Sequence, residues 1–166
     1  MDLGAEVDVI RNDSIDFSKL AYDGVVLSPG PGLPSGAGQL MALIEQIAED
    51  IPILGVCLGM QAIAEFLGGE IYNQMKVKHG VEEQVLLYES PLFSGLNKEI
   101  TVGLYHSWAV VPESNNYHVI AESRSGVVMA IQNEQKKMYG VQFHPESVMT
   151  PEGKKIIKNF LNLLAN

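Results

Sequence analysis

The only cysteine of the chain lies at the centre of residues 55–59, Gly-Val-Cys-Leu-Gly. An apolar run at 51–54 precedes this segment, and a helix-like stretch at 60–67 follows it. A nucleophile on a sharp turn from strand to helix needs small residues two positions to either side, because the backbone packs tightly there. A helix N-terminus behind a thiol also favours the reactive thiolate. The pattern therefore predicts a nucleophilic Cys57, against the alternative of a buried and inert cysteine.

His144 and Glu146 have the residue types and spacing of a base and its orienting acid. They follow a strand-like run at 138–143, and Pro145 restricts His144 to extended backbone geometry. Residues two apart in an extended chain project to the same side, so the carboxylate could fix the tautomer of the imidazole. With Cys57 they would form a triad of nucleophile, base and acid. On its own, His-x-Glu would equally suit an exposed strand end.

A proline- and glycine-rich loop at 28–32, Ser-Pro-Gly-Pro-Gly, follows the apolar strand-like run 24–27. Such a loop is rigid, and its backbone can approach a ligand closely. The N–H of Gly30 could pair with that of Leu58 to hold an oxyanion, with Gly32 as the alternative to Gly30. An ordinary turn is the other interpretation. Phosphate binding is disfavoured, because no Gly-Lys-Ser/Thr follows and the dinucleotide glycine spacing fails at Ser35.

Strands and helices alternate in the first half of the chain, and strands dominate the second half. We expect helices at about 38–49 and 59–67 and a final helix after Thr150-Pro151. We expect strands at 7–11, 24–28, 52–56, 70–74, 83–88, 99–110, 118–123, 126–132 and 138–143. This order predicts an α/β fold, a doubly wound and mostly parallel sheet with helices on both faces and an antiparallel subset. Ligands bind such sheets beyond the carboxyl ends of the strands, where the three candidate motifs lie.

Composition excludes several classes of protein. A chain of 166 residues suits a single domain, 1–166, with a core of its own. No apolar run reaches the length of a membrane-spanning helix, and residues 1–15 carry acids and no apolar block, so we expect no membrane and no secretory signal. One cysteine fits a reducing compartment, which predicts a cytoplasmic protein. A net charge of −9 argues against nucleic acid as a partner.

A zinc site is an alternative use of the cysteine, because His79, His106 and His144 are also of a ligand type that zinc accepts. No closely spaced pair of ligands in the sequence supports such a site. We therefore expect no metal and no cofactor in this chain.

Four motifs taken together resemble those of the class I, or triad-type, glutamine amidotransferases. The similarity is strongest to the glutaminase components (component II) of anthranilate synthase and aminodeoxychorismate synthase, and it rests on segments 27–32, 53–61, 105–108 and 140–147. The resemblance implies a flavodoxin-like core and a reaction in which the thiolate of Cys57 attacks the side-chain amide of L-glutamine. It also implies that His144 protonates the departing ammonia and then activates the water that hydrolyses the thioester.

The resemblance further implies a substrate pocket and a protein partner. The pocket would be lined by Gly30, Pro31, Gly32, Gln61 and, through their backbone, Ser107 and Trp108. The partner would be a chorismate-using synthase subunit (component I), most directly that of anthranilate synthase in tryptophan biosynthesis. Three alternatives stay open: the folate pathway, another acceptor such as that of GMP synthetase or carbamoyl phosphate synthetase, and an inactive scaffold subunit.

The N-terminal segment departs from the family pattern. Family members begin with an apolar strand and a first helix, whereas residues 1–9 look like the end of that helix running into the second strand. We therefore expect a chain that is truncated relative to the family and lacks the first strand and most of the first helix. The loss of that strand would leave a slot beside the strands at 7–11 and 24–28.

Overall fold

The computed structural model describes residues 3–165. Within them one mixed sheet has the strand order β1-β2-β7-β6-β5-β3-β4. The strands are Val25–Leu27 (β1), Ile53–Val56 (β2), Ile71–Leu87 (β3), Glu99–Val110 (β4), His118–Ser123 (β5), Val128–Asn133 (β6) and Met138–Val141 (β7). The helices are Leu40–Ile47 (α1), Leu58–Phe66 (α2) and Gly153–Leu164 (α3), with 3-10 turns at Phe17–Lys19, Pro34–Gly36 and Pro91–Phe93.

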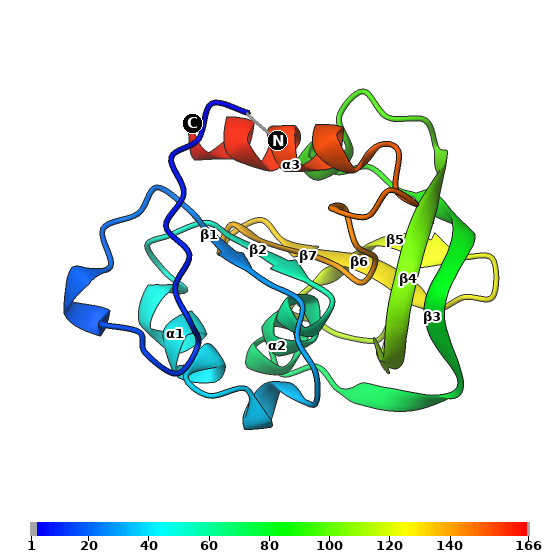
Figure 1. Ribbon diagram of the computed structural model, residues 1–166. Helices are drawn as coiled ribbons and strands as arrows, with labels where there is room; N and C mark the ends of the chain where they lie inside the picture. The colour runs from blue at the N-terminus through cyan, green and yellow to red at the C-terminus, as the bar shows by residue number, and fades with distance from the viewer. Residues whose placement is uncertain (1–2, 166) are drawn as a thin grey trace.

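Helices cover both faces of the sheet, as the sequence predicted. Figure 1 shows α3 on one face and α1 and α2 on the other. One apolar cluster lies between the sheet and the α1–α2 layer, and it includes Leu43, Ile44 and Ile47 of α1. A second cluster includes Ile156 and Phe160 of α3 and packs against the opposite face. The predicted α/β class is confirmed, and none of the helices in the described residues has the length and hydropathy needed to cross a bilayer.

We expected a mostly parallel sheet, but most of its strand pairs are antiparallel. β1 pairs with β2 and β2 with β7 in parallel. The remaining pairs, β7–β6, β6–β5, β5–β3 and β3–β4, are antiparallel. The reason lies in the connections, because no α-helix separates the strands from β3 to β7. Parallel strands need a long crossover connection, whereas antiparallel strands are joined by short turns.

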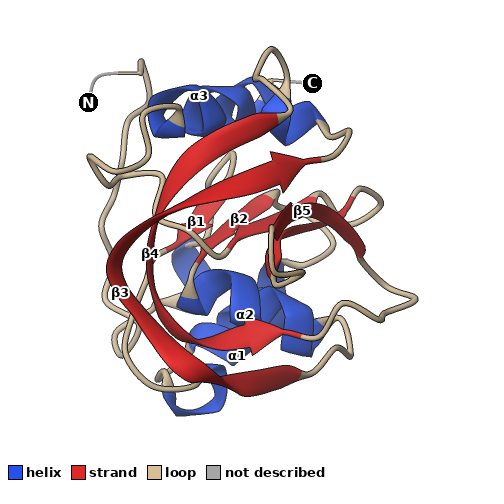
Figure 2. Cartoon of the chain, turned by 90° about the vertical axis from the view of Figure 1, so that its right-hand side faces the viewer, coloured by secondary structure: helices blue, strands red, loops and turns tan. Residues whose placement is uncertain are grey.

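The strands expected separately at 70–74 and 83–88 are one strand, β3. It pairs with β4 along most of its length and with β5 near its C-terminal end. The register with β4 shifts between Asn73 and Lys78 and again between His79 and Val81. Bulges of this kind bend a strand and increase its twist. Figure 2 shows the result, in which β3 and β4 curve together from the α3 side of the sheet to the side of α1 and α2.

The expected strand at 7–11 is wrong. Residues 7–11 have no strand pairing, and Val7 and Val9 are 75% and 94% exposed. The alternating apolar pattern is typical of a strand, but a strand also needs a hydrogen-bonded neighbour. β1 pairs with β2 and forms the edge of the sheet in the described residues.

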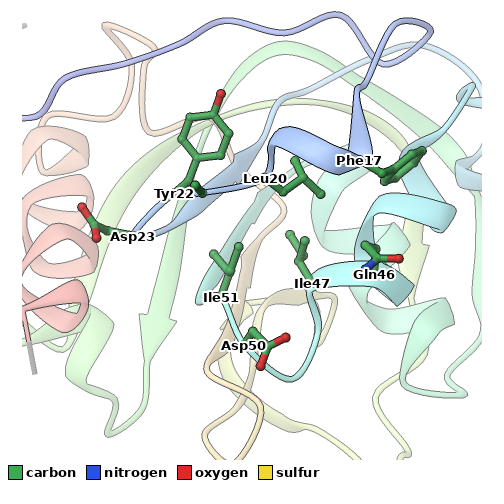
Figure 3. A pocket seen from close by; sticks show the side chains of 9 residues that line it. Phe17, Leu20, Tyr22, Asp23, Gln46, Ile47, Asp50 and Ile51 are labelled. Atoms are coloured by element: carbon green, nitrogen blue, oxygen red, sulfur yellow. The ribbon is translucent and has the colours of Figure 1, made fainter.

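A hollow of about 330 Å³ lies among residues 17–23, the C-terminal end of α1 and Ile51. Figure 3 shows Phe17, Leu20 and Ile47 among the side chains that line it. No residue of the predicted catalytic or substrate-binding set lines this hollow, so it takes no part in the chemistry considered below.

Candidate active site

Cys57 occupies a strained turn between β2 and α2. Its backbone has φ 53° and ψ −103°, and it is the N-cap residue of α2. A positive φ is uncommon for a residue with a side chain, and such strain clusters at functional sites. The turn from strand to helix that the glycine spacing predicted is therefore confirmed.

The glycines on either side of the cysteine are required by packing. A Cβ atom at Gly55 would lie 2.4 Å from the carbonyl of Gly59, and one at Gly59 would lie 2.5 Å from the carbonyl oxygen of Leu27. Real Cβ atoms do not approach backbone this closely, so α2 could not start directly against β1 and β2 with larger residues at these positions.

Cys57 is only 7% exposed, and burial raises the pKa of its thiol. The backbone N–H of Leu58 and the side-chain amide of Gln142 lower the pKa, and the charge of Glu146 raises it. The net direction is upward, so the stabilisation of the thiolate expected from the helix N-terminus is outweighed by desolvation. The thiol therefore needs a neighbouring base if it is to react near neutral pH.

His144 and Glu146 lie side by side as the sequence predicted. Nδ1 of His144 lies 2.7 Å from Oε1 of Glu146, and because a carboxylate only accepts, Nδ1 donates its hydrogen there. In the neutral imidazole the lone pair is then on Nε2. The ring of Tyr105 packs edge-on against the imidazole, with ring centroids 4.9 Å apart. Nε2 is buried and makes no hydrogen bond with any described residue, Cys57 included. The His144–Glu146 pair is thus confirmed, and its contact with the thiol stays a prediction.

The topology brings the candidate nucleophile and base to one end of the sheet. β2 and β7 are parallel neighbours in which Val56 is opposite Val141, and Cys57 and His144 follow these residues. The N–H of Cys57 donates to the carbonyl of Val141 at 2.8 Å, so the two segments stay paired beyond the strands. Parallel strands end at the same edge, which is where ligands bind in α/β sheets.

Thr150 ties the loop of His144 to β4. Its hydroxyl donates to the carbonyl of His144 at 2.7 Å and accepts from the N–H of Gly103 at 3.0 Å. The N–H of His144 also donates to the carbonyl of Gly103. The start of α3 also packs closely against this loop. A Cβ atom added at Gly153 would lie only 1.8 Å from the carbonyl oxygen of Pro145. The position of the base therefore depends on β4 and α3 as well as on β7.

Thr150→Val should lower the free energy of unfolding by about 1–3 kcal/mol, because the buried N–H of Gly103 loses its acceptor. Urea unfolding measures this loss. Thr150→Ser keeps the hydroxyl and is the matched control, for which we expect most of the stability to be retained. Equal stabilities of the valine and serine variants would show that the hydroxyl contributes nothing.

The loop at 28–32 packs against the beginning of α2. A Cβ atom at Gly30 would lie 2.9 Å from a methyl group of Leu58, so these two residues are neighbours. Gly32 has φ 82° with open space around it, and Pro31 is exposed. The closeness of Gly30 and Leu58 favours this pair for the oxyanion hole over the alternative with Gly32, and the assignment stays a prediction.

Gln61 and Trp108, both expected in the substrate pocket, are in direct contact. Nε2 of Gln61 donates to the carbonyl oxygen of Trp108 at 3.2 Å and to Oε1 of Gln142 at 3.1 Å. Ser107 lies beside Trp108 on β4. The sequence reasoning missed Gln142, although it stands two positions before His144 within the 140–147 motif.

The described residues offer no set of ligands for the zinc site considered above. Within residues 3–165 no group of three or more His, Cys, Asp or Glu side chains could hold a metal ion. His79 instead packs edge-on against Tyr105, and Nδ1 of His106 faces the carbonyl oxygen of Trp108 at 2.8 Å.

Comparison with known proteins assigns the chain to a family. The family model described as "Glutamine amidotransferase class-I" matches residues 1–164. The chain therefore belongs to the class I glutamine amidotransferases, the family that its motifs resemble.

Individual proteins of known sequence or structure are also similar to this chain. "Aminodeoxychorismate/anthranilate synthase component 2" of Bacillus subtilis is 39% identical over 165 residues, 96% of this chain and 85% of that protein. "Bifunctional protein TrpGD" of Thermotoga maritima is 40% identical over 95% of this chain, which spans only 28% of that protein. Among solved structures, a putative GMP synthase protein from Thermoplasma acidophilum superposes with a TM-score of 0.86 at 30% identity, covering 95% of this chain and 80% of that one.

Proposed function

We propose that the chain is a glutaminase subunit that hydrolyses L-glutamine and passes the ammonia to a chorismate-using synthase subunit. The observation that carries the proposal is the strained Cys57 at the end of β2, with the His144–Glu146 pair at the end of the neighbouring parallel strand. Cysteine, base and orienting acid are the parts of a nucleophilic amide hydrolysis.

The proposed reaction has two halves. Nε2 of His144 takes the proton of the thiol, and the sulfur attacks the side-chain carbonyl carbon of glutamine while the N–H groups of Gly30 and Leu58 hold the oxyanion. The imidazolium, stabilised by Glu146, gives its proton to the departing ammonia and leaves a γ-glutamyl thioester. Water that loses a proton to His144 then attacks the thioester, which releases glutamate and restores the thiol.

A separate acceptor follows from the chemistry of ammonia. Free ammonia at neutral pH is mostly ammonium, which is not nucleophilic, so a glutaminase of this kind is useful only beside an acceptor site. The name of the Bacillus subtilis relative contains both anthranilate and aminodeoxychorismate synthase. We propose the anthranilate synthase of tryptophan biosynthesis as the first candidate, and the aminodeoxychorismate synthase of the folate pathway as the second.

The test measures glutamate release from glutamine by the purified chain, alone and with each type of chorismate-using synthase subunit. We expect one synthase subunit to raise glutamate release and to form its amino product from chorismate and glutamine. Anthranilate as the product supports the first candidate, and aminodeoxychorismate supports the second. The synthase subunit supplied with an ammonium salt and no glutaminase is the control. No glutamate with either subunit would contradict the proposal and favour an inactive scaffold.

A further inference from the structure

Gln142 lies beside the candidate nucleophile although 85 positions separate them in the chain. It directly follows β7, whose Val141 is opposite Val56 of β2, so the register places Gln142 next to Cys57. Its backbone N–H donates to the carbonyl of Met129 on β6 at 2.8 Å, and its side chain is fully buried. The side-chain amide is therefore held in place by the middle of the sheet.

The orientation of this amide is determined by its neighbours. The carbonyl oxygen of Trp108 can only accept, so Gln61 must direct its Nε2 there, at 3.2 Å. The same Nε2 faces the side chain of Gln142 at 3.1 Å, so Gln142 must present its oxygen to Gln61. Its nitrogen then points to the sulfur of Cys57, at 3.5 Å.

The far end of this chain of hydrogen bonds is also anchored. His106 is 4% exposed, and burial lowers its pKa, which keeps the imidazole neutral. Its Nδ1 lies 2.8 Å from the carbonyl oxygen of Trp108 and 3.1 Å from Nε2 of Gln74. The carbonyl oxygen of Trp108 accepts from Gln61, and this contact sets the direction of the hydrogen bonds from β4 to the sulfur.

We propose that Gln142 is a positioning residue that donates its side-chain N–H to the sulfur of Cys57 and couples the nucleophile to Gln61 and Trp108 of the glutamine pocket. The inference rests on the proposed function, because it assigns a role within that reaction. An N–H donor stabilises a thiolate more than a thiol, so Gln142 offsets part of the effect of burial on the cysteine. The charge of Glu146 acts on this sulfur. His144, the base of the proposed reaction, is the other titratable group that follows β7 at this end of the sheet.

The experiment follows the pH dependence of Cys57 alkylation by iodoacetamide, which reports the thiol pKa without requiring glutaminase activity. This is the only thiol in the chain, so no other site contributes. Gln142→Met keeps the size of the side chain and removes the donor, and we expect the midpoint of alkylation to rise by roughly 0.5–1 pH unit. Gln142→Glu places a negative charge beside the sulfur, and we expect a larger rise than in the methionine variant.

Gln132→Met is the matched control. Gln132 is a buried glutamine on β6 whose amide hydrogen-bonds with Ser90 and Glu134, neither of which belongs to the candidate site. We expect this variant to keep the alkylation midpoint and the glutaminase activity of the parent, whereas kcat in Gln142→Met should fall roughly tenfold.

A midpoint that is unchanged in both folded Gln142 variants would overturn the role of Gln142. Circular dichroism shows whether each variant folds. If one Gln142 variant does not fold, the alkylation midpoint of the other one tests the role of Gln142. A different result would contradict the proposed function, namely that the parent chain releases no glutamate with either synthase subunit. The two failures are therefore distinguishable.

Discussion

Cys57→Ser should reduce glutamine hydrolysis at least about a thousandfold, because removal of a catalytic nucleophile typically costs that much or more. A serine hydroxyl ionises far less readily than a thiol. Serine has nearly the shape of cysteine, so the strained turn at φ 53° should be kept and the melting temperature should change little. Glutamate release and thermal unfolding measure the two effects.

Covalent labelling checks the same assignment independently. A glutamine analogue that carries an electrophile should modify Cys57 and no other residue of the parent chain, and it should leave the serine variant unmodified. Glutaminase activity in Cys57→Ser near the level of the parent would show that another group attacks the amide.

Gly59→Ala should be strongly destabilising although it adds only one methyl group. Its Cβ atom would lie 2.5 Å from the carbonyl oxygen and 2.7 Å from the Cβ of Leu27, so α2 or β1 would have to move. Overpacking of this kind costs about 1–3 kcal/mol and sometimes more, which exceeds the gain of about 1 kcal/mol from alanine in a helix. We expect a net loss of about 2 kcal/mol in the free energy of unfolding, together with a loss of thiol reactivity because the turn at Cys57 shifts.

Gly36→Ala is the control for this change. A Cβ atom at Gly36 would meet nothing within 4 Å, and its φ is not positive. We expect its stability to stay within about 0.5 kcal/mol of the parent, as for most surface substitutions. Urea unfolding compares the two variants, and equal stabilities would mean that the approach of α2 to β1 adapts without cost.

The sequence by itself determined the features that depend on a few consecutive residues. The turn at Cys57 is local, because glycines two positions away let a helix start directly behind a strand. The pairing of His144 with Glu146 is local as well, because Pro145 keeps the backbone extended between them. The helices expected from apolar periodicity formed for the same reason, since each stripe of apolar residues can be read within one segment.

Only the tertiary structure decided the features that depend on distant partners. Residues 7–11 have the alternating pattern of a strand but pair with no strand of the described residues. β3, by contrast, continues through its bulges because β4 lies beside it. The pKa of Cys57 rises because the surrounding fold buries the thiol more effectively than the helix N-terminus stabilises its charge. Gln142 meets Cys57 only because β2 and β7 are parallel neighbours in a defined register, and strand pairing across 85 positions cannot be read from either segment alone.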